Sequence, residues 1–162
     1  MTAKSDDAKR KSRCVALNHL GGTLLAEASS LDGRAARELF KSACATYGEA
    51  LALAPVMVEA LVGLGRARLA LATRTTDRAA RENLLRLARQ VLLQAEQLEA
   101  GAAAYDLARA SALAGDLAAC RSWLEKANVD LHLPPAGELY ADPDLAAVRG
   151  EPWLENLFGT RR

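Results

Sequence analysis

The chain contains 162 residues, of which 51% are hydrophobic but only 4% are aromatic. Its apolar content is mostly Ala and Leu, which favours one domain of closely packed helices and argues against a β-sandwich. A formal net charge of +1 disfavours nucleic acid as a partner. The sequence has no run of about 18 apolar residues, so no membrane span is predicted.

The first predicted element is a polar, basic leader over residues 1–13, which we expect to be disordered. This leader lacks the apolar segment of a secretory signal. The three cysteines, Cys14, Cys44 and Cys120, are odd in number and widely spaced. We therefore expect a cytoplasmic protein whose thiols are reduced.

Three pairs of helices are predicted after the leader, over residues 14–55, 56–100 and 101–130. Apolar residues recur within each helix at three- and four-residue steps, as expected for one buried face. A small residue follows a leucine in the first helix of every pair, and the second helix carries a small–bulky–small order. The small residues of the first helices are Gly21, Gly65 and Ala108, and the second-helix orders are Ala43-Tyr47-Ala50, Ala88-Leu92-Ala95 and Cys120-Leu124-Ala127.

This pattern over residues 14–130 resembles about three repeats of the tetratricopeptide repeat (TPR) family. The resemblance implies an all-α fold of antiparallel helix pairs stacked as a short right-handed superhelix, a TPR-like α-solenoid. The family period is 34 residues, whereas Gly21, Gly65 and Ala108 stand 44 and 43 residues apart. The first two repeats are therefore expected to have lengthened helices.

Residues 131–162 are predicted to form a linker and C-terminal capping helices, because a repeat array must cover its final apolar face. Prolines 134 and 135 forbid a helix across their junction. Asp142-Pro143 and Glu151-Pro152 each combine a cap residue with a proline that suits the first helical position. An Asp-rich calcium loop is not expected here, because the further oxygen ligands are missing.

The resemblance implies a concave groove that is lined by the first helices of the pairs. By register, its candidate residues are Asn18, His19, Glu59, Val62, Arg66, Tyr105, Asp106 and Arg109. Arg66 and Arg109 occupy equivalent places, so their guanidinium groups are expected to bind carboxylates of a partner segment. The alternative is that both only keep the groove solvated. The residues of the family's clamp for chaperone C-termini are not present.

No zinc, phosphate-loop or nucleophile motif occurs in the sequence, and His19 and His132 are each isolated. We therefore expect no catalytic, cofactor-binding or metal-binding residues and do not expect an enzyme. The expected function is that of a scaffold or adaptor that binds a protein or peptide partner in the groove. The alternative is a dedicated small chaperone of a secreted or assembled client protein.

Charge is distributed unevenly along the chain, with a net charge of +5 over residues 66–89 and −7 over residues 90–160. Opposite charges of this kind favour steering of partners or head-to-tail self-association. The alternative is that they lie on solvated helix faces. The arginine-rich stretch lacks neighbouring aromatic residues for base stacking, which disfavours nucleic-acid binding.

Overall fold

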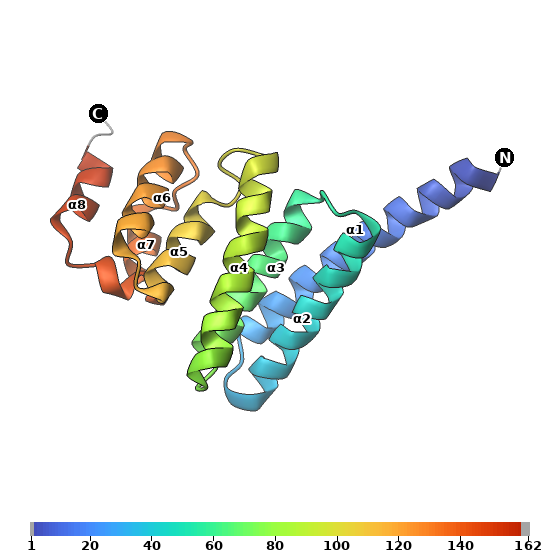
Figure 1. Ribbon diagram of the computed structural model, residues 1–162, viewed down its shortest axis with the longest axis horizontal. Coiled ribbons are helices and arrows are strands. Elements are labelled where there is room, and N and C mark those ends of the chain that lie inside the picture. The colour runs from blue at the N-terminus through green and yellow to red at the C-terminus, as the bar shows by residue number, and fades with distance from the viewer. Residues whose placement is uncertain (1, 160–162) are drawn as a thin grey trace.

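The computed structural model describes residues 2–159, with side chains described for residues 5–157. All regular elements in this range are helical, which confirms the predicted all-α class (Figure 1). They are α1 (Thr2–Ser29), α2 (Gly33–Leu53), α3 (Val58–Thr73), α4 (Arg78–Leu98), α5 (Ala104–Ala114), α6 (Leu117–Val129), α7 (Ala136–Ala141), the 3₁₀ helix η1 (Pro143–Val148) and α8 (Pro152–Gly159). No helix in this range combines the length and apolarity needed to cross a membrane.

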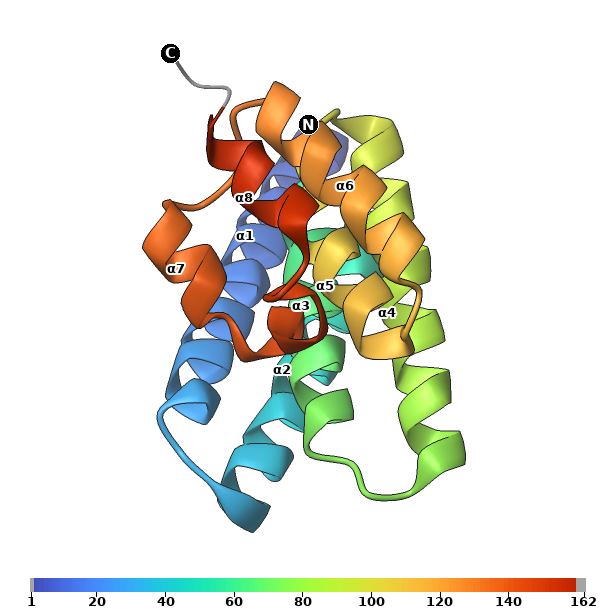
Figure 2. The ribbon, with the colours of Figure 1, turned by 90° about the vertical axis from the view of Figure 1, so that its left-hand side faces the viewer.

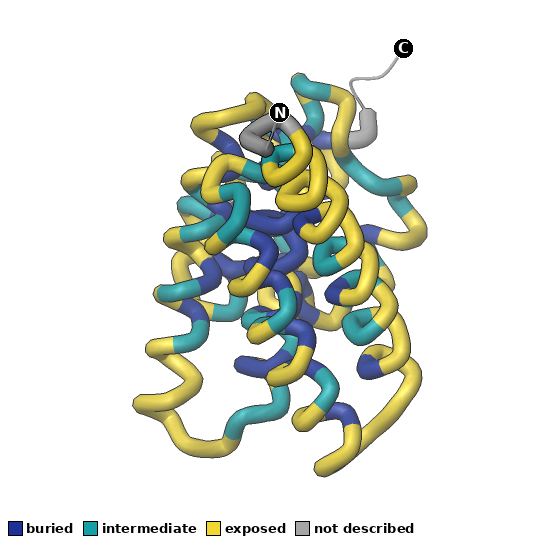
Figure 3. Tube along the Cα trace, turned by 90° about the vertical axis from the view of Figure 1, so that its right-hand side faces the viewer, coloured by how far each residue is buried: buried dark blue, intermediate teal, exposed yellow. Residues whose placement is uncertain are grey.

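The helices pack as pairs that follow the chain. α1 packs on α2, α3 on α4 and α5 on α6, and the second helix of each pair also packs on the first helix of the next pair (Figure 1). The first helices touch one another as well, because α3 contacts both α1 and α5. Buried residues concentrate between the helices, and exposed residues cover their outer faces (Figure 3).

Small residues allow the helices of each pair to approach closely. A Cβ atom built at Gly21 would lie 2.8 Å from the Tyr47 ring, and one at Gly65 would lie 2.5 Å from Leu92. Ala108 is fully buried in the cluster that α5 forms with α6. The matched small and bulky positions read from the sequence therefore meet between the two helices of each pair.

The stretch expected to be a disordered leader is helical from Thr2 onward, so α1 begins well before the expected start at residue 14. Residues 2–13 contain neither glycine nor proline, the residues that most disfavour a helix. Asp7 also forms ion pairs one turn away, at 2.8 Å from Arg10 and 3.5 Å from Lys11. Met1 lies outside the described residues. The first turns of α1 extend beyond the rest of the molecule (Figure 1).

The C-terminal elements cover the last helix pair (Figure 2). Leu139 of α7, Leu145 of η1 and Leu154 of α8 are fully buried against residues of α5 and α6. η1 and α8 agree with the helix starts predicted at Asp142-Pro143 and Glu151-Pro152. α7 was not predicted. It begins directly after the two prolines, where Pro135 serves as its N-cap residue.

The N-terminus of α4 provides a test of one capping interaction. The Asp77 carboxylate accepts a hydrogen bond of 2.7 Å from the backbone N–H of Ala80, whereas Asp32, the N-cap of α2, makes no such bond. Asp77→Ala is therefore expected to lower the free energy of unfolding by about 1 kcal/mol, measured by urea denaturation. Asp32→Ala is the matched control, and equal losses in the two variants would contradict the assignment.

Candidate binding groove

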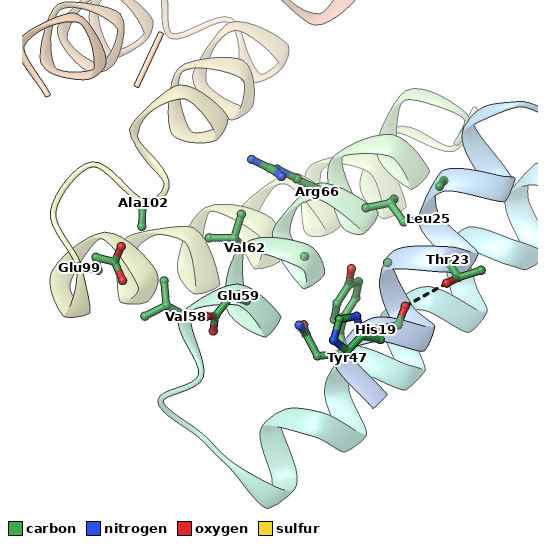
Figure 4. A pocket seen from close by; sticks show the side chains of 14 residues that line it. His19, Thr23, Leu25, Tyr47, Val58, Glu59, Val62, Arg66, Glu99 and Ala102 are labelled. Carbon is green, nitrogen blue, oxygen red and sulfur yellow. Dashed lines mark hydrogen bonds between the residues drawn. The ribbon is translucent and has the colours of Figure 1, made fainter. Parts of the chain in front are cut away.

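α1 and α3 face each other across an open groove with a volume of about 720 Å³ (Figure 4). One wall carries Asn18, His19 and Thr23 from α1, and the other carries Glu59, Val62 and Arg66 from α3. Five of the predicted site residues therefore line one groove: Asn18, His19, Glu59, Val62 and Arg66. Both walls are helical, so these side chains project from a rigid backbone.

The floor of the groove is formed where two glycines meet an aromatic ring. The Tyr47 ring lies against the Cα atoms of Gly21 on α1 and Gly63 on α3, so a Cβ atom at either glycine would collide with it. The side chain of Tyr47 is 4% exposed, and its hydroxyl group makes no hydrogen bond within the described part of the chain. Burial raises the pKa of this hydroxyl, so it stays protonated and can donate to a ligand. The sequence marked Tyr47 only as a packing residue.

A second hollow of about 400 Å³ continues from the groove toward α5. Arg66 and Ala102 line both spaces, while Tyr105 and Asp106 line only the second. The far side of this hollow is formed by residues 131–134. The structure therefore places Tyr105 and Asp106 in this second hollow rather than in the groove itself, and Arg109 lines neither space.

Asp106 lies between the two arginines that the sequence places in equivalent positions. One carboxylate oxygen is 2.8 Å from Nε of Arg66, and the other is 3.0 Å from Nη1 of Arg109. The side chain of Asp106 is only 2% exposed. Each guanidinium group is therefore already engaged with a carboxylate of the protein itself.

Arg109 is enclosed by the start of η1. Its guanidinium group lies 3.2 Å from Asp142 and 2.7 Å from Asp144, and the Tyr105 hydroxyl donates a 2.8 Å hydrogen bond to Asp142. Burial and the neighbouring Asp142 raise the pKa of Asp144 in spite of the arginine beside it. Arg109 is thus not available to a partner. Only Arg66, whose side chain is 51% exposed, faces the groove.

A buried glutamate holds the loop at the end of the groove. Glu96 accepts hydrogen bonds from the backbone N–H groups of Gly101 at 2.8 Å and Ala103 at 2.9 Å, and Lys126 donates to the same carboxylate. Burial alone would raise the pKa of Glu96. The three hydrogen-bond donors together lower it by more than burial raises it, so the pKa lies below its usual value. The glutamate therefore stays ionised and positions Ala102 at the groove.

The charges left over in the groove are acidic. Arg66 is engaged with Asp106, whereas Glu59 and Glu99 are exposed and form no ion pair with any described residue. The sequence pointed instead to arginines that bind carboxylates of the partner. The unpaired negative charge of the groove therefore favours a ligand that carries a basic group.

The arrangement suits non-covalent recognition, with hydrogen-bonding and charged groups held on two helices above an apolar floor. Over residues 5–157, no three His, Cys, Asp or Glu side chains are grouped so that they could hold a metal ion. Comparisons of the chain with protein-family models, with curated proteins and with solved structures found no match.

Proposed function

We propose that this protein is a non-catalytic binding scaffold that holds a segment of a partner protein in the groove between α1 and α3. The observation that carries the proposal is an open groove in which three polar side chains have no partner among the described residues. Asn18, His19 and Glu59 line it, and their side chains make no hydrogen bond or ion pair to other described residues. Groups of this kind remain free to bind a ligand.

The proposal includes a TPR-like stacking of the three helix pairs. It is supported by the close approach of Gly21 to Tyr47 and of Gly65 to Leu92 at matched positions of successive pairs. It is also supported by the contacts of α3 with α1 and with α5, since these three helices would then form the groove side of the array.

The partner segment is proposed to carry a basic residue. Glu59 and Glu99 supply two uncompensated carboxylates, and the Tyr47 hydroxyl supplies a further oxygen near the floor. An arginine of the partner would form charge-assisted hydrogen bonds with these carboxylates, which are stronger than neutral ones. Arg66 contributes little to an acidic partner, because Asp106 already neutralises it.

Site-specific photo-crosslinking in the native host tests the groove. A crosslinking residue at His19 or at Glu59 is expected to trap the same partner protein, because both side chains project into one groove. The same residue at Arg37, which is exposed on α2 and does not line the groove, is expected to trap no such partner. The adducts are identified by mass spectrometry.

Gly22→Phe provides the control for occupancy of the groove. The nearest atom to a Cβ at Gly22 is the Tyr47 hydroxyl oxygen at 3.7 Å, so the larger side chain has room to project into the groove. This variant is expected to fold normally and to lose the adduct. If folded Gly22→Phe still yields the adduct, the partner does not bind in the groove. If Glu59→Lys leaves the adduct unchanged, only the proposal that the partner segment is basic is refuted.

A further inference from the structure

A second surface arises because the helix pairs differ in length. α4 contains 21 residues, whereas α5 contains 11 and α6 contains 13. α5 runs antiparallel to α4 and ends before it reaches the start of α4, so the first turns of α4 extend past the third pair (Figure 1). We call the resulting hollow, between the first half of α4 and the end of α5, the arginine shelf. Its volume is about 860 Å³.

The floor of the shelf continues the seam between α4 and α5. Leu85 and Ala110 belong to the core cluster that joins these two helices, and Leu113 packs at its edge. The same three residues line the shelf. Leu85 is 8% exposed and Leu113 is half-buried, so the shelf exposes only the edge of this apolar seam.

The charged groups at the shelf are mainly basic. They are Arg78, Arg81, Arg86 and Arg89, together with Glu82 and Asp116. Arg89 makes no hydrogen bond or ion pair with another described residue, and Arg86 donates only to the neutral amide of Asn83, at 2.8 Å. Arg78 is paired with Glu82 at 2.7 Å. Positive charge therefore exceeds the negative charge that the shelf itself supplies.

We propose that the arginine shelf binds a short acidic amphipathic helix of a partner protein. The apolar side of that helix packs on Leu85 and Leu113, in the place that α5 would occupy if it were longer. Its carboxylates face Arg86 and Arg89, whose planar guanidinium groups match carboxylates in two parallel hydrogen bonds. An amphipathic helix that lays its apolar face in a groove is a common mode of protein recognition. The shelf shares no lining residue with the groove between α1 and α3.

Two other occupants fit the shelf less well. Single-stranded nucleic acid binds through aromatic stacking beside basic residues, and no aromatic residue lines the shelf. A second copy of this chain would have to supply acids other than Asp106, Asp142 and Asp144, because these three are already paired with arginines of the same chain.

Fluorescence anisotropy with the full chain and synthetic peptides tests the proposal. The probe is a helical peptide of Leu, Ala and Glu, with leucines spaced to form one apolar face and glutamates on the flanks. A peptide with lysine in place of every glutamate is its control. The acidic peptide is expected to bind and to weaken as salt increases, while the lysine peptide does not bind.

Reversing the charge of two shelf arginines tests whether the acidic peptide binds at the shelf. Arg86→Glu/Arg89→Glu is expected to raise the dissociation constant of the acidic peptide at least about tenfold, since it replaces attraction by repulsion. Arg34→Glu/Arg37→Glu, with the same spacing on the exposed surface of α2, is expected to leave it unchanged. Circular dichroism shows that each variant is folded.

Three results would overturn the proposal. The first is no detectable binding of the acidic peptide to the wild-type chain. The second is tighter binding of a single-stranded oligothymidylate that Arg86→Glu/Arg89→Glu abolishes, which would make the shelf a nucleic-acid site. The third is salt-sensitive self-association that the same variant abolishes in sedimentation, which would make it a contact between copies of the chain.

Discussion

Arg109→Ala is expected to lower the free energy of unfolding by about 3–5 kcal/mol, because removing one partner of a buried ion pair leaves uncompensated charge. The Arg109 guanidinium group lies within 3.2 Å of three carboxylates, those of Asp106, Asp142 and Asp144. Among the described residues, Asp106 alone of these three carboxylates keeps an ion pair, with Arg66, when Arg109 is removed. Urea denaturation monitored by circular dichroism measures the loss.

The pH dependence separates this electrostatic loss from lost packing. Burial already raises the pKa of Asp144, and without Arg109 this carboxylate becomes still harder to ionise in the folded state, so its folded pKa rises further above the unfolded one. A raised carboxyl pKa lowers stability above the unfolded pKa, and the penalty disappears as the pH falls below it. The loss is therefore expected to be larger at about pH 7 than at about pH 4. A loss that is equal at both values would point to packing alone.

Arg10→Ala is the matched control for Arg109→Ala. Arg10 pairs with Asp7 at 2.8 Å over the same three-residue spacing that separates Arg109 from Asp106, but on the exposed surface of α1. Exposed pairs contribute little to stability, so this variant is expected to unfold like the wild type. Similar losses in the two variants would refute the enclosure of Arg109 by η1.

The register of the helix pairs was predictable from the sequence because it depends on local pattern. A small residue stands directly after a leucine in the first helix of each pair, at Gly21, Gly65 and Ala108. The bulky residue that each of them contacts lies in the next helix of the chain. The groove walls at Asn18, His19, Glu59, Val62 and Arg66 follow from the same register. The same contacts recur between the two helices of each pair, so the recurring sequence pattern is enough to predict which residues make these contacts.

The surroundings of Arg109 were not predictable from the same pattern. Asp142 and Asp144 reach it from a segment outside the three helix pairs, more than thirty residues further along the chain. Their sequence, Asp142-Pro143-Asp144, indicates a helix start but not what that start covers. The count of acidic residues over positions 90–160 also did not show that Glu96, Asp106, Asp142 and Asp144 are held in ion pairs within the fold.

The junction between the first two pairs depends on the absence of a single methyl group. The Tyr47 ring lies between Gly21 and Gly63, and a Cβ atom at Gly63 would overlap it. The ring cannot move away, because Gly21 of α1 closes the other side. Gly63→Ala is therefore expected to lower the free energy of unfolding by about 1–3 kcal/mol through overpacking. This is opposite to the gain of about 1 kcal/mol that alanine normally gives over glycine within a helix.

Two further variants make that prediction specific to the ring. Gly48 is exposed in α2 next to Tyr47 and has no atom within 4 Å of a Cβ built on it, so Gly48→Ala is expected to raise stability by about 0.5–1 kcal/mol. In a Tyr47→Leu background the obstructing ring is gone, and Gly63→Ala is expected to be neutral or stabilising. A double-mutant cycle from urea denaturation measures this coupling. If Gly63→Ala costs the same with and without the tyrosine ring, the close approach of α3 to α2 does not depend on that contact, and the groove floor built on it is wrong.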